Sequence, residues 1–215
     1  MSWLFNPQIL GFLAGGLGVT LGMAVLAIAI SFVLGTAFAL ARLSRRPLVR
    51  VPATLYIEGM RALPVFLIVL FVYLAMPKLI GFKLSPFAAG VTALAAFTAA
   101  LVAEIVRAGI LAVPSGIVEA AVSQGFSASE RLRLIVMPIA LRQMTPALTA
   151  QFVTLLKDTS LTAVIGNLEL LRRAQIVDSQ PPFQPIPVFA LVALTYFVVN
   201  FSLSLVSRRL ESPVR

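Results

Sequence analysis

GLGVTLGMAVLAIAISFVLGTAFAL, residues 16–40, contains no charged side chain and decides the fold class. The hydrocarbon core of a bilayer is about 30 Å thick and an α-helix rises about 1.5 Å per residue, so a span needs roughly 20 apolar residues. Residues 16–40 are long enough for one such helix, and we expect residues 1–15, with Trp3 to Phe12, to form a lead-in at the membrane interface. The stretch predicts an all-α integral membrane protein.

The composition of the whole chain agrees with this prediction and excludes several functions. Of 215 residues, 60% are hydrophobic and 12% charged, and the mean hydropathy is +1.00, whereas soluble domains carry about 25% charged residues. The chain has neither Cys nor His, so disulfides, thiolate or imidazole metal sites and His-based catalytic triads are excluded. No Gly-Lys dipeptide occurs, so a phosphate-binding loop is absent and any ATP must bind another chain.

Further apolar stretches predict four more spans. Only 16 uncharged residues separate Arg61 from Lys78, so the second span must reach back past Arg61 and carry charge within it. The fourth is either one span that carries Lys157 and Asp158 or a broken one. We expect five transmembrane helices over about residues 16–40, 54–77, 84–106, 143–168 and 188–207, in a domain of residues 16–207 with a tail of residues 208–215.

The basic residues predict how the bundle is oriented. A net charge of +9 on a soluble protein would suggest nucleic acid, but on so apolar a chain it indicates membrane orientation, and we expect no nucleic-acid partner. Cytoplasmic loops hold the excess of Lys and Arg. Eleven basic residues fall on one side (42, 45, 46, 50, 107, 131, 133, 142, 208, 209 and 215) and four on the other (78, 83, 172 and 173). We therefore expect the N-terminus outside, the C-terminus inside and the loop of residues 109–140 in the cytoplasm.

The loop of residues 109–140 has the pattern of two short helices. Ser115 and Gly125 fit the N-cap and the C-terminal stop of the first, and Ser127 to Glu130 fits a capping box that begins the second, which Pro138 should bend or end. With Ala120 and Ala121 exposed beside Glu119, the first helix would fit a groove on another protein. Spacing alone favours the alternative, an ordinary amphipathic loop that packs on the bundle.

The residues of this loop carry a family resemblance. Glu119-Ala120-Ala121, three residues, Gly125, nine residues and Ile135-Val136-Met137-Pro138 closely resemble the E-A-A-x3-G-x9-I-x-L-P loop of ATP-binding-cassette (ABC) importer permeases. Met137 stands where the family usually has Leu. The segments Glu58 to Pro64, Glu104 to Ile110 and Leu156 to Leu161 look like the polar amino acid subfamily, of histidine, glutamine and glutamate/aspartate type.

The resemblance implies an assembly and a role. This chain would be a type I permease subunit in the bacterial inner membrane, with no catalytic residue, metal or cofactor of its own. Two ATP-binding subunits, which hold ATP and Mg, would dock on the short helix at Glu119, Ala120, Ala121, Gly125 and Pro138. The other implied partners are a binding protein for a polar amino acid and a second permease subunit, either a copy or a paralogue.

The charges inside predicted spans are the further candidates for function, because a charge at the centre of a span costs about 2.5–3.5 kcal/mol unless it is paired or faces a polar cavity. Glu104 and Arg107, three residues apart, are expected to form a structural ion pair. Glu58 and Arg61 have the same spacing and lie near Pro64, which should free the carbonyl of Met60. For these, a structural pair and a place on the substrate pathway are equally open.

Lys157, Asp158, Thr159 and Ser160 are four consecutive polar residues in an apolar segment. Neighbouring residues on a helix point about 100° apart, so Lys157 and Asp158 cannot pair face to face. We expect these four residues to line the substrate pathway or its gate, with packing between subunits as the alternative.

The rival function for the whole chain is a secondary transporter or channel driven by an ion gradient, which would have no reason to carry the Glu119 loop.

Overall fold

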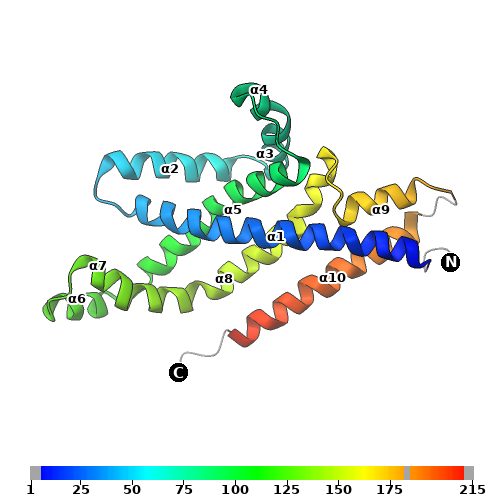
Figure 1. Cartoon of the computed structure of the whole chain (residues 1–215). Helices are drawn as coiled ribbons and strands as arrows, with labels where there is room; N and C mark the ends of the chain where they lie inside the picture. Colours follow the sequence, from blue (N-terminus) through cyan, green and yellow to red (C-terminus); the bar gives the residue numbers. More distant parts are fainter. Residues whose placement is uncertain (1–5, 182–184, 211–215) are drawn as a thin grey trace.

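The computed structural model describes residues 6–181 and 185–210, and these ranges contain helices and turns but no β-strand (Figure 1). The α-helices are α1 (Pro7–Arg42), α2 (Pro47–Ala62), α3 (Val65–Leu70), α4 (Met76–Ile80), α5 (Pro86–Leu111), α6 (Ser115–Ser123), α7 (Ala128–Arg131), α8 (Met137–Asp158), α9 (Leu170–Asp178) and α10 (Pro185–Leu210). Two π-helical turns, η2 (Phe71–Ala75) and η3 (Leu132–Val136), and a 3₁₀ helix, η4 (Thr159–Ile165), join some of them.

α1 is one unbroken helix of 36 residues along the length of the molecule (Figure 1). Asn6 caps it by accepting a hydrogen bond from the backbone N–H of Gln8 at 2.9 Å, and Pro7 occupies the first position, where a missing N–H costs nothing. The first helix therefore begins at Pro7 rather than at residue 16, and it includes residues 7–15 of the expected lead-in. Trp3 lies outside the described residues.

α5 is the enclosed helix of the bundle and packs against α1. In its most apolar stretch 67% of residues are buried, compared with 11% in α10. The two backbones approach closely at Gly35 of α1, where an added Cβ would lie 2.8 Å from the carbonyl oxygen of Ala99 and 2.7 Å from the Cβ of Val102. α5 thus provides the surface on which the other elements are placed.

The second expected span, residues 54–77, is broken. α2 starts at Pro47, ends at Ala62 and is bent by 106° from the following helical segment. The residue before a proline is pushed out of the helical region, and Leu63 is extended (φ −101°, ψ 142°) before Pro64. Leu63 donates its N–H to the carbonyl of Met60 at 3.4 Å, so the expectation that Pro64 frees this carbonyl is wrong.

The sequence predicted that Pro138 bends or ends its helix, and the structure shows that the helix does not end there. The π-helical turn η3 precedes it and places Pro138 at the second position of α8, where its missing N–H is tolerated. Pro77 stands in the same way after η2. The fourth helix therefore begins at Met137 rather than at residue 143.

The structure adds an element that we did not expect. α8 ends at Asp158, continues as η4 and stops at Gly166, whose φ of 80° lies in the left-handed region that favours glycine. α9 then packs against α1 and η4. By length and apolarity α1, α5 and α10 qualify as spans among the described residues, and the bent α2 segment makes a fourth. α8 does not qualify, so up to four spans are found among the described residues where five were expected.

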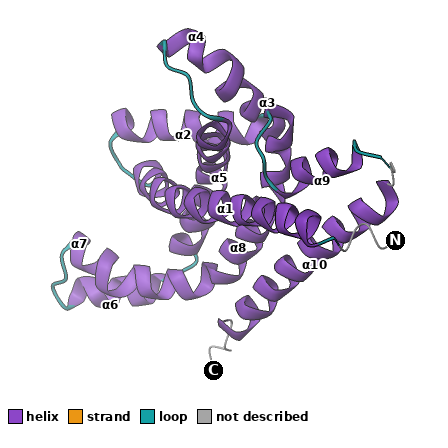
Figure 2. Ribbon diagram, turned by 45° about the vertical axis from the view of Figure 1, so that its right-hand side comes forward, coloured by secondary structure: helices purple, strands orange, loops and turns teal. Residues whose placement is uncertain are grey.

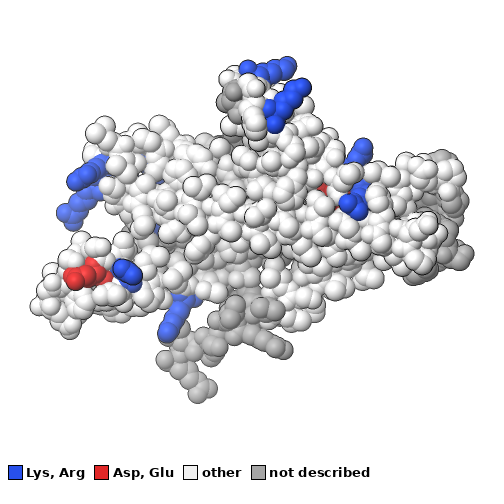
Figure 3. Space-filling view, viewed as in Figure 1, with Lys and Arg blue, Asp and Glu red and all other residues white. Residues whose placement is uncertain are grey.

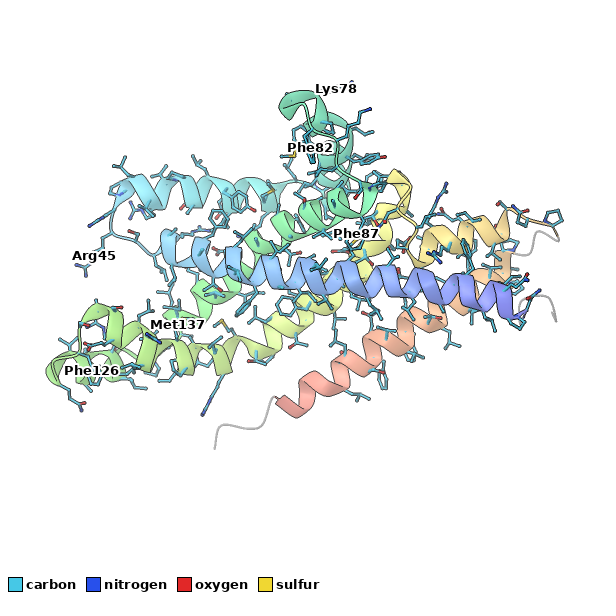
Figure 4. The ribbon with its side chains drawn as sticks, in the orientation of Figure 1. Arg45, Lys78, Phe82, Phe87, Phe126 and Met137 are labelled. Carbon is cyan, nitrogen blue, oxygen red and sulfur yellow. The ribbon has the colours of Figure 1, made fainter. Side chains whose placement is uncertain are left out.

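The charged residues sort to separate parts of the molecule. The α1–α2 connection and the α6–α7 pair lie at one end of α1, and α9 lies toward the other (Figures 1 and 2). Arg45 and Phe126 mark the first end in Figure 4, and Lys78 and Phe82 lie on the projection that contains α4. Figure 3 shows a largely uncharged surface between these regions.

Candidate functional site

α6 and the turn after it form a short projection at one end of the molecule. Glu119 and Ala120 are exposed, but Ala121 is buried, with 3% of its surface accessible, so the expected exposed alanine pair is only half right. Gly125 has a φ of 82°, which confirms its predicted role as the helix stop. The projection thus presents the Glu119 carboxylate and the small Ala120 side chain together with the exposed apolar side chains of Ile117 and Val122.

The caps of this projection agree only partly with the sequence prediction. Pro114, not Ser115, holds the N-cap position of α6, and it makes no side-chain hydrogen bond. The capping box is confirmed, because a carboxylate oxygen of Glu130 accepts hydrogen bonds from the backbone N–H of Ser127 at 2.9 Å and from its hydroxyl at 2.6 Å. Pro138 is exposed and lines a groove of about 390 Å³ together with Arg142.

Five charged residues from three helices form a single cluster, which we call the Arg42 network. Arg42 of α1 donates to Glu104 of α5 at 2.6 Å and to Glu58 of α2 at 2.7 Å. Arg107 pairs with Glu104 at 2.9 Å, and Arg61 lies 3.7 Å from Glu58 and 3.9 Å from Glu104. The two carboxylates therefore neutralise most of the charge of three arginines.

The sequence predicted both ion pairs of this network but not their union. The i,i+3 spacing identified Glu58 with Arg61 and Glu104 with Arg107, and both contacts are present. Arg42 was counted only as an orientation signal. Arg42 stands at the end of the longest uncharged stretch. An arginine at such a position can extend its long side chain to charged partners near the membrane surface, and this could have indicated its role.

The four polar residues from Lys157 to Ser160 point to different places. Lys157 is exposed in a groove of about 380 Å³ between α8 and α10, and Asp158 is half-buried. Thr159 is fully buried and donates its hydroxyl to the carbonyl of Leu156 at 2.7 Å. Ser160 lines a separate cavity of about 620 Å³. The structure therefore does not gather them into one cluster.

A buried carboxylate that sequence analysis missed fixes α9. Glu169 is completely buried and accepts hydrogen bonds from the backbone N–H groups of Leu171 at 2.9 Å and Arg172 at 2.7 Å and from the hydroxyl of Tyr196 at 3.1 Å. Thr20 of α1 accepts the N–H of Leu170 at 3.2 Å. Only the sequence Asn167-Leu168-Glu169 before a short amphipathic run hinted at this N-cap.

The geometry defines a multi-pass helical membrane protein with a broken second helix, a charged network between helices and an exposed helical projection. The profile of the family described as "Binding-protein-dependent transport system inner membrane component" matches residues 31–215. The chain belongs to this family of ABC importer permeases, which are multi-pass proteins of the inner membrane.

Individual relatives match over nearly the whole chain. A probable glutamine ABC transporter permease protein, GlnP, of Bacillus subtilis is 43% identical over 96% of this chain and 95% of its own length. The glutamine transport system permease protein GlnP of Escherichia coli K12 is 34% identical, over 98% and 96%. A crystal structure of an amino acid ABC transporter with histidines superposes with a TM-score of 0.88 at 33% identity, over 95% of this chain and 94% of that one.

Proposed function

We propose that this chain forms the membrane pathway of an ATP-driven importer for a polar amino acid, and that α6 couples it to a separate ATPase subunit. The observation that carries the coupling role is the exposed α6 projection, held by the Gly125 stop and the Ser127 capping box. A second permease subunit, a copy or a paralogue, encloses the pathway together with this chain. An amino acid binding protein delivers the substrate on the opposite side.

The named relatives support the choice of substrate class. Two are named for glutamine and a third relative, ArtQ of Bacillus subtilis, is named for arginine. L-Glutamine is therefore the first candidate, with L-arginine and L-histidine next. ATP and Mg bind the ATPase subunits in this proposal, because the chain lacks a phosphate-binding loop.

The orientation follows from the same proposal. α6 faces the cytoplasm, where ATP is available, and the α1–α2 connection with Arg45 lies at the same end of the molecule (Figure 4). The N-terminus is then outside and the C-terminus inside, as the distribution of Lys and Arg predicts. α9 and the α4 projection lie toward the outer face.

Replacement of residues in α6 tests the coupling role. In Gly125→Val the stop can no longer adopt a left-handed φ without strain, and in Glu119→Ala the exposed carboxylate is lost. We expect both variants to enter the membrane but to copurify with much less ATPase subunit. Gly116→Ala, with open space around its Cβ position, is the control. Full ATPase binding and full transport in both test variants would contradict the proposal.

A further inference from the structure

A cavity lies between two segments far apart in the sequence. Phe66 and Tyr73, from α3 and η2, line one side, and Ser160, Arg172 and Gln175, from η4 and α9, line the other. Its volume of about 620 Å³ is in the range of small-molecule sites, roughly 300–1,000 Å³. We call it the Arg172 cavity.

Arg172 brings an uncompensated positive charge into this cavity. Its guanidinium is half-buried and donates to the side-chain oxygen of Gln175 at 3.2 Å, and it forms no salt bridge with the described residues. None of the residues that line the cavity in the described chain is acidic. Glu169 is close in sequence, but its carboxylate binds the backbone N–H of Arg172 rather than the guanidinium.

The neighbouring arginine shows what a purely structural arginine looks like here. Arg173 donates to the carbonyls of Phe12 at 2.7 Å and Leu168 at 3.0 Å, and its guanidinium lies 4.8 Å from the ring centre of Phe12. Its donors are used to fasten α9 to α1. The guanidinium of Arg172, in contrast, makes one hydrogen bond with the described residues, to Gln175, and both residues line the cavity.

The position of Arg172 is also fixed before any ligand arrives. Glu169 caps α9 and is held by Tyr196, while Thr20 accepts the N–H of Leu170. The first turn of α9 is thereby attached to α1 and α10. The backbone that carries Arg172 is therefore in place before a ligand binds, so its ordering adds no cost to binding.

We propose that the Arg172 cavity binds the α-carboxylate of the transported amino acid, as a subsite in the half of the molecule away from α6. The planar guanidinium is suited to bidentate recognition of a carboxylate. Ser160 donates its own hydrogen to the carbonyl of Lys157 at 2.8 Å, which leaves its oxygen to accept from the ammonium. The hydroxyl of Tyr73 and the amide of Gln175 complete the polar lining. The inference rests on the proposed function, since it assumes an amino acid substrate.

Direct binding to the purified complex of permease and ATPase subunits in detergent tests this subsite. The probe is tritiated L-glutamine, with L-arginine and L-histidine as further ligands, and the binding protein is omitted so that its selectivity does not contribute. We expect Arg172→Gln to weaken binding at least about tenfold, as the loss of a charged hydrogen bond predicts, and Arg172→Lys to weaken it less. Lys83→Gln removes the same charge from an exposed position outside the cavity and should bind like the wild type.

Two further measurements protect the test against misfolding and against a different ligand. Gln175→Glu keeps the size of the side chain but puts a carboxylate beside Arg172, and it should weaken glutamine binding as well. Glutamine α-amide, which lacks the carboxylate, should bind the wild type weakly. Its affinity should not fall further in Arg172→Gln. If Arg172→Gln instead abolishes a dependence of ATPase activity on phosphatidylglycerol while glutamine binding is unchanged, a lipid headgroup is the ligand and the proposal is wrong.

The outcomes separate this inference from the proposed function. If the wild-type complex binds and transports none of the three amino acids, the proposed function fails. If it transports one of them, and Arg172→Gln binds and transports that amino acid equally well, only the subsite is wrong.

Discussion

Arginines at the two ends of this molecule are treated in opposite ways. In the Arg42 network, three arginines share two carboxylates at distances of 2.6 to 3.9 Å. In the Arg172 cavity, one guanidinium meets an amide and no carboxylate among the described residues. The protein therefore compensates most of the charge where three helices must be joined and leaves it uncompensated where a cavity opens.

This difference separates structural charge from functional charge. A paired charge in an apolar protein stabilises only the conformation that brings the pair together, whereas an unpaired one carries a cost that a ligand of opposite charge can remove. The comparison predicts that changes in the Arg42 network mainly affect folding. Changes around α9 should mainly affect ligand binding.

The largest effect is expected for Glu104→Gln. Glu104 has 19% of its side chain exposed and contacts three arginines, so its neutralisation leaves Arg107 without a carboxylate in the network and Arg42 and Arg61 with Glu58 alone. Breaking such a pair costs about 3–5 kcal/mol. Glu58→Gln is the matched control, since Glu58 is 54% exposed and solvent screens its pairs, and it should cost at most about 1 kcal/mol. Resistance of the purified complex to unfolding by dodecyl sulfate measures both, and equal losses would contradict the structural role of the network.

Two glycines of α1 allow the two ends of the molecule to be compared by the same substitution, because Gly35 contacts α5 and Gly16 contacts α9. Gly35→Ala would place a Cβ 2.7 Å from Val102 and force α1 and α5 apart, at a cost of about 1–3 kcal/mol. Gly16→Ala would place one 3.0 Å from the backbone of Leu170 and displace α9. We therefore expect Gly35→Ala to lower stability, and Gly16→Ala to lower stability and also glutamine affinity.

Gly18→Ala is the control for both variants. Its added methyl would meet nothing within 4 Å, and the gain in helix propensity of up to about 1 kcal/mol should leave stability unchanged or raised. Dodecyl sulfate unfolding and tritiated glutamine binding are measured for all three. If Gly16→Ala binds glutamine as tightly as Gly18→Ala does, α9 does not position the ligand.

The sequence predicted the larger features of the fold for a clear physical reason. Uncharged stretches such as residues 84–103 and 16–40 have to be helical in a bilayer, and both proved helical, although α1 begins nine residues before residue 16. Capping by Ser127 and Glu130 is local and was therefore also predictable. The break at Pro64 was foreseen only as a lost hydrogen bond, because a bend of 106° depends on the packing of α3 against α5.

The parts of the site that were missed depend on contacts between distant residues. Arg42 is 62 positions from Glu104, and Thr20 is 150 positions from Leu170. No spacing rule relates such pairs. The four residues from Lys157 to Ser160 looked like one cluster because they are adjacent, but the turn from α8 into η4 points their side chains toward three different surroundings.

A smaller effect is expected for Tyr196→Phe. The variant removes the hydroxyl that donates to Glu169 at 3.1 Å and leaves the buried carboxylate with backbone donors, at a cost of about 1–3 kcal/mol. Glutamine affinity should fall, whereas copurification of the ATPase subunit should not change. Thr195→Val is the control on the same helix, since Thr195 only donates to the carbonyl of Leu191. Lower ATPase binding in Tyr196→Phe would show that α9 and the ATPase-binding α6 projection are not independent.

The smallest effect concerns Glu130 in the α6–α7 turn. The hydrogen bonds from the hydroxyl and the N–H of Ser127 hold the pKa of Glu130 below its usual value of 4.5. Since the folded pKa is the lower one, the cap contributes fully above about pH 4.5 and is lost as the pH falls through the folded pKa. Hydrogen-exchange protection of the Glu130 amide should therefore be constant at higher pH and drop once the pH falls below the usual value of 4.5. Ser127→Ala should lack this drop and Ser129→Ala should keep it, and equal profiles in both would exclude the cap.

ATP-driven uptake is the most direct test of the central claim that this chain is the permease of an ABC importer. The chain is reconstituted in proteoliposomes with its ATPase subunit and binding protein, and uptake of tritiated L-glutamine, L-arginine and L-histidine is measured. We expect uptake of at least one of them that requires both ATP and the binding protein and disappears in Gly125→Val. Uptake that proceeds without ATP and follows an imposed proton or sodium gradient would contradict it.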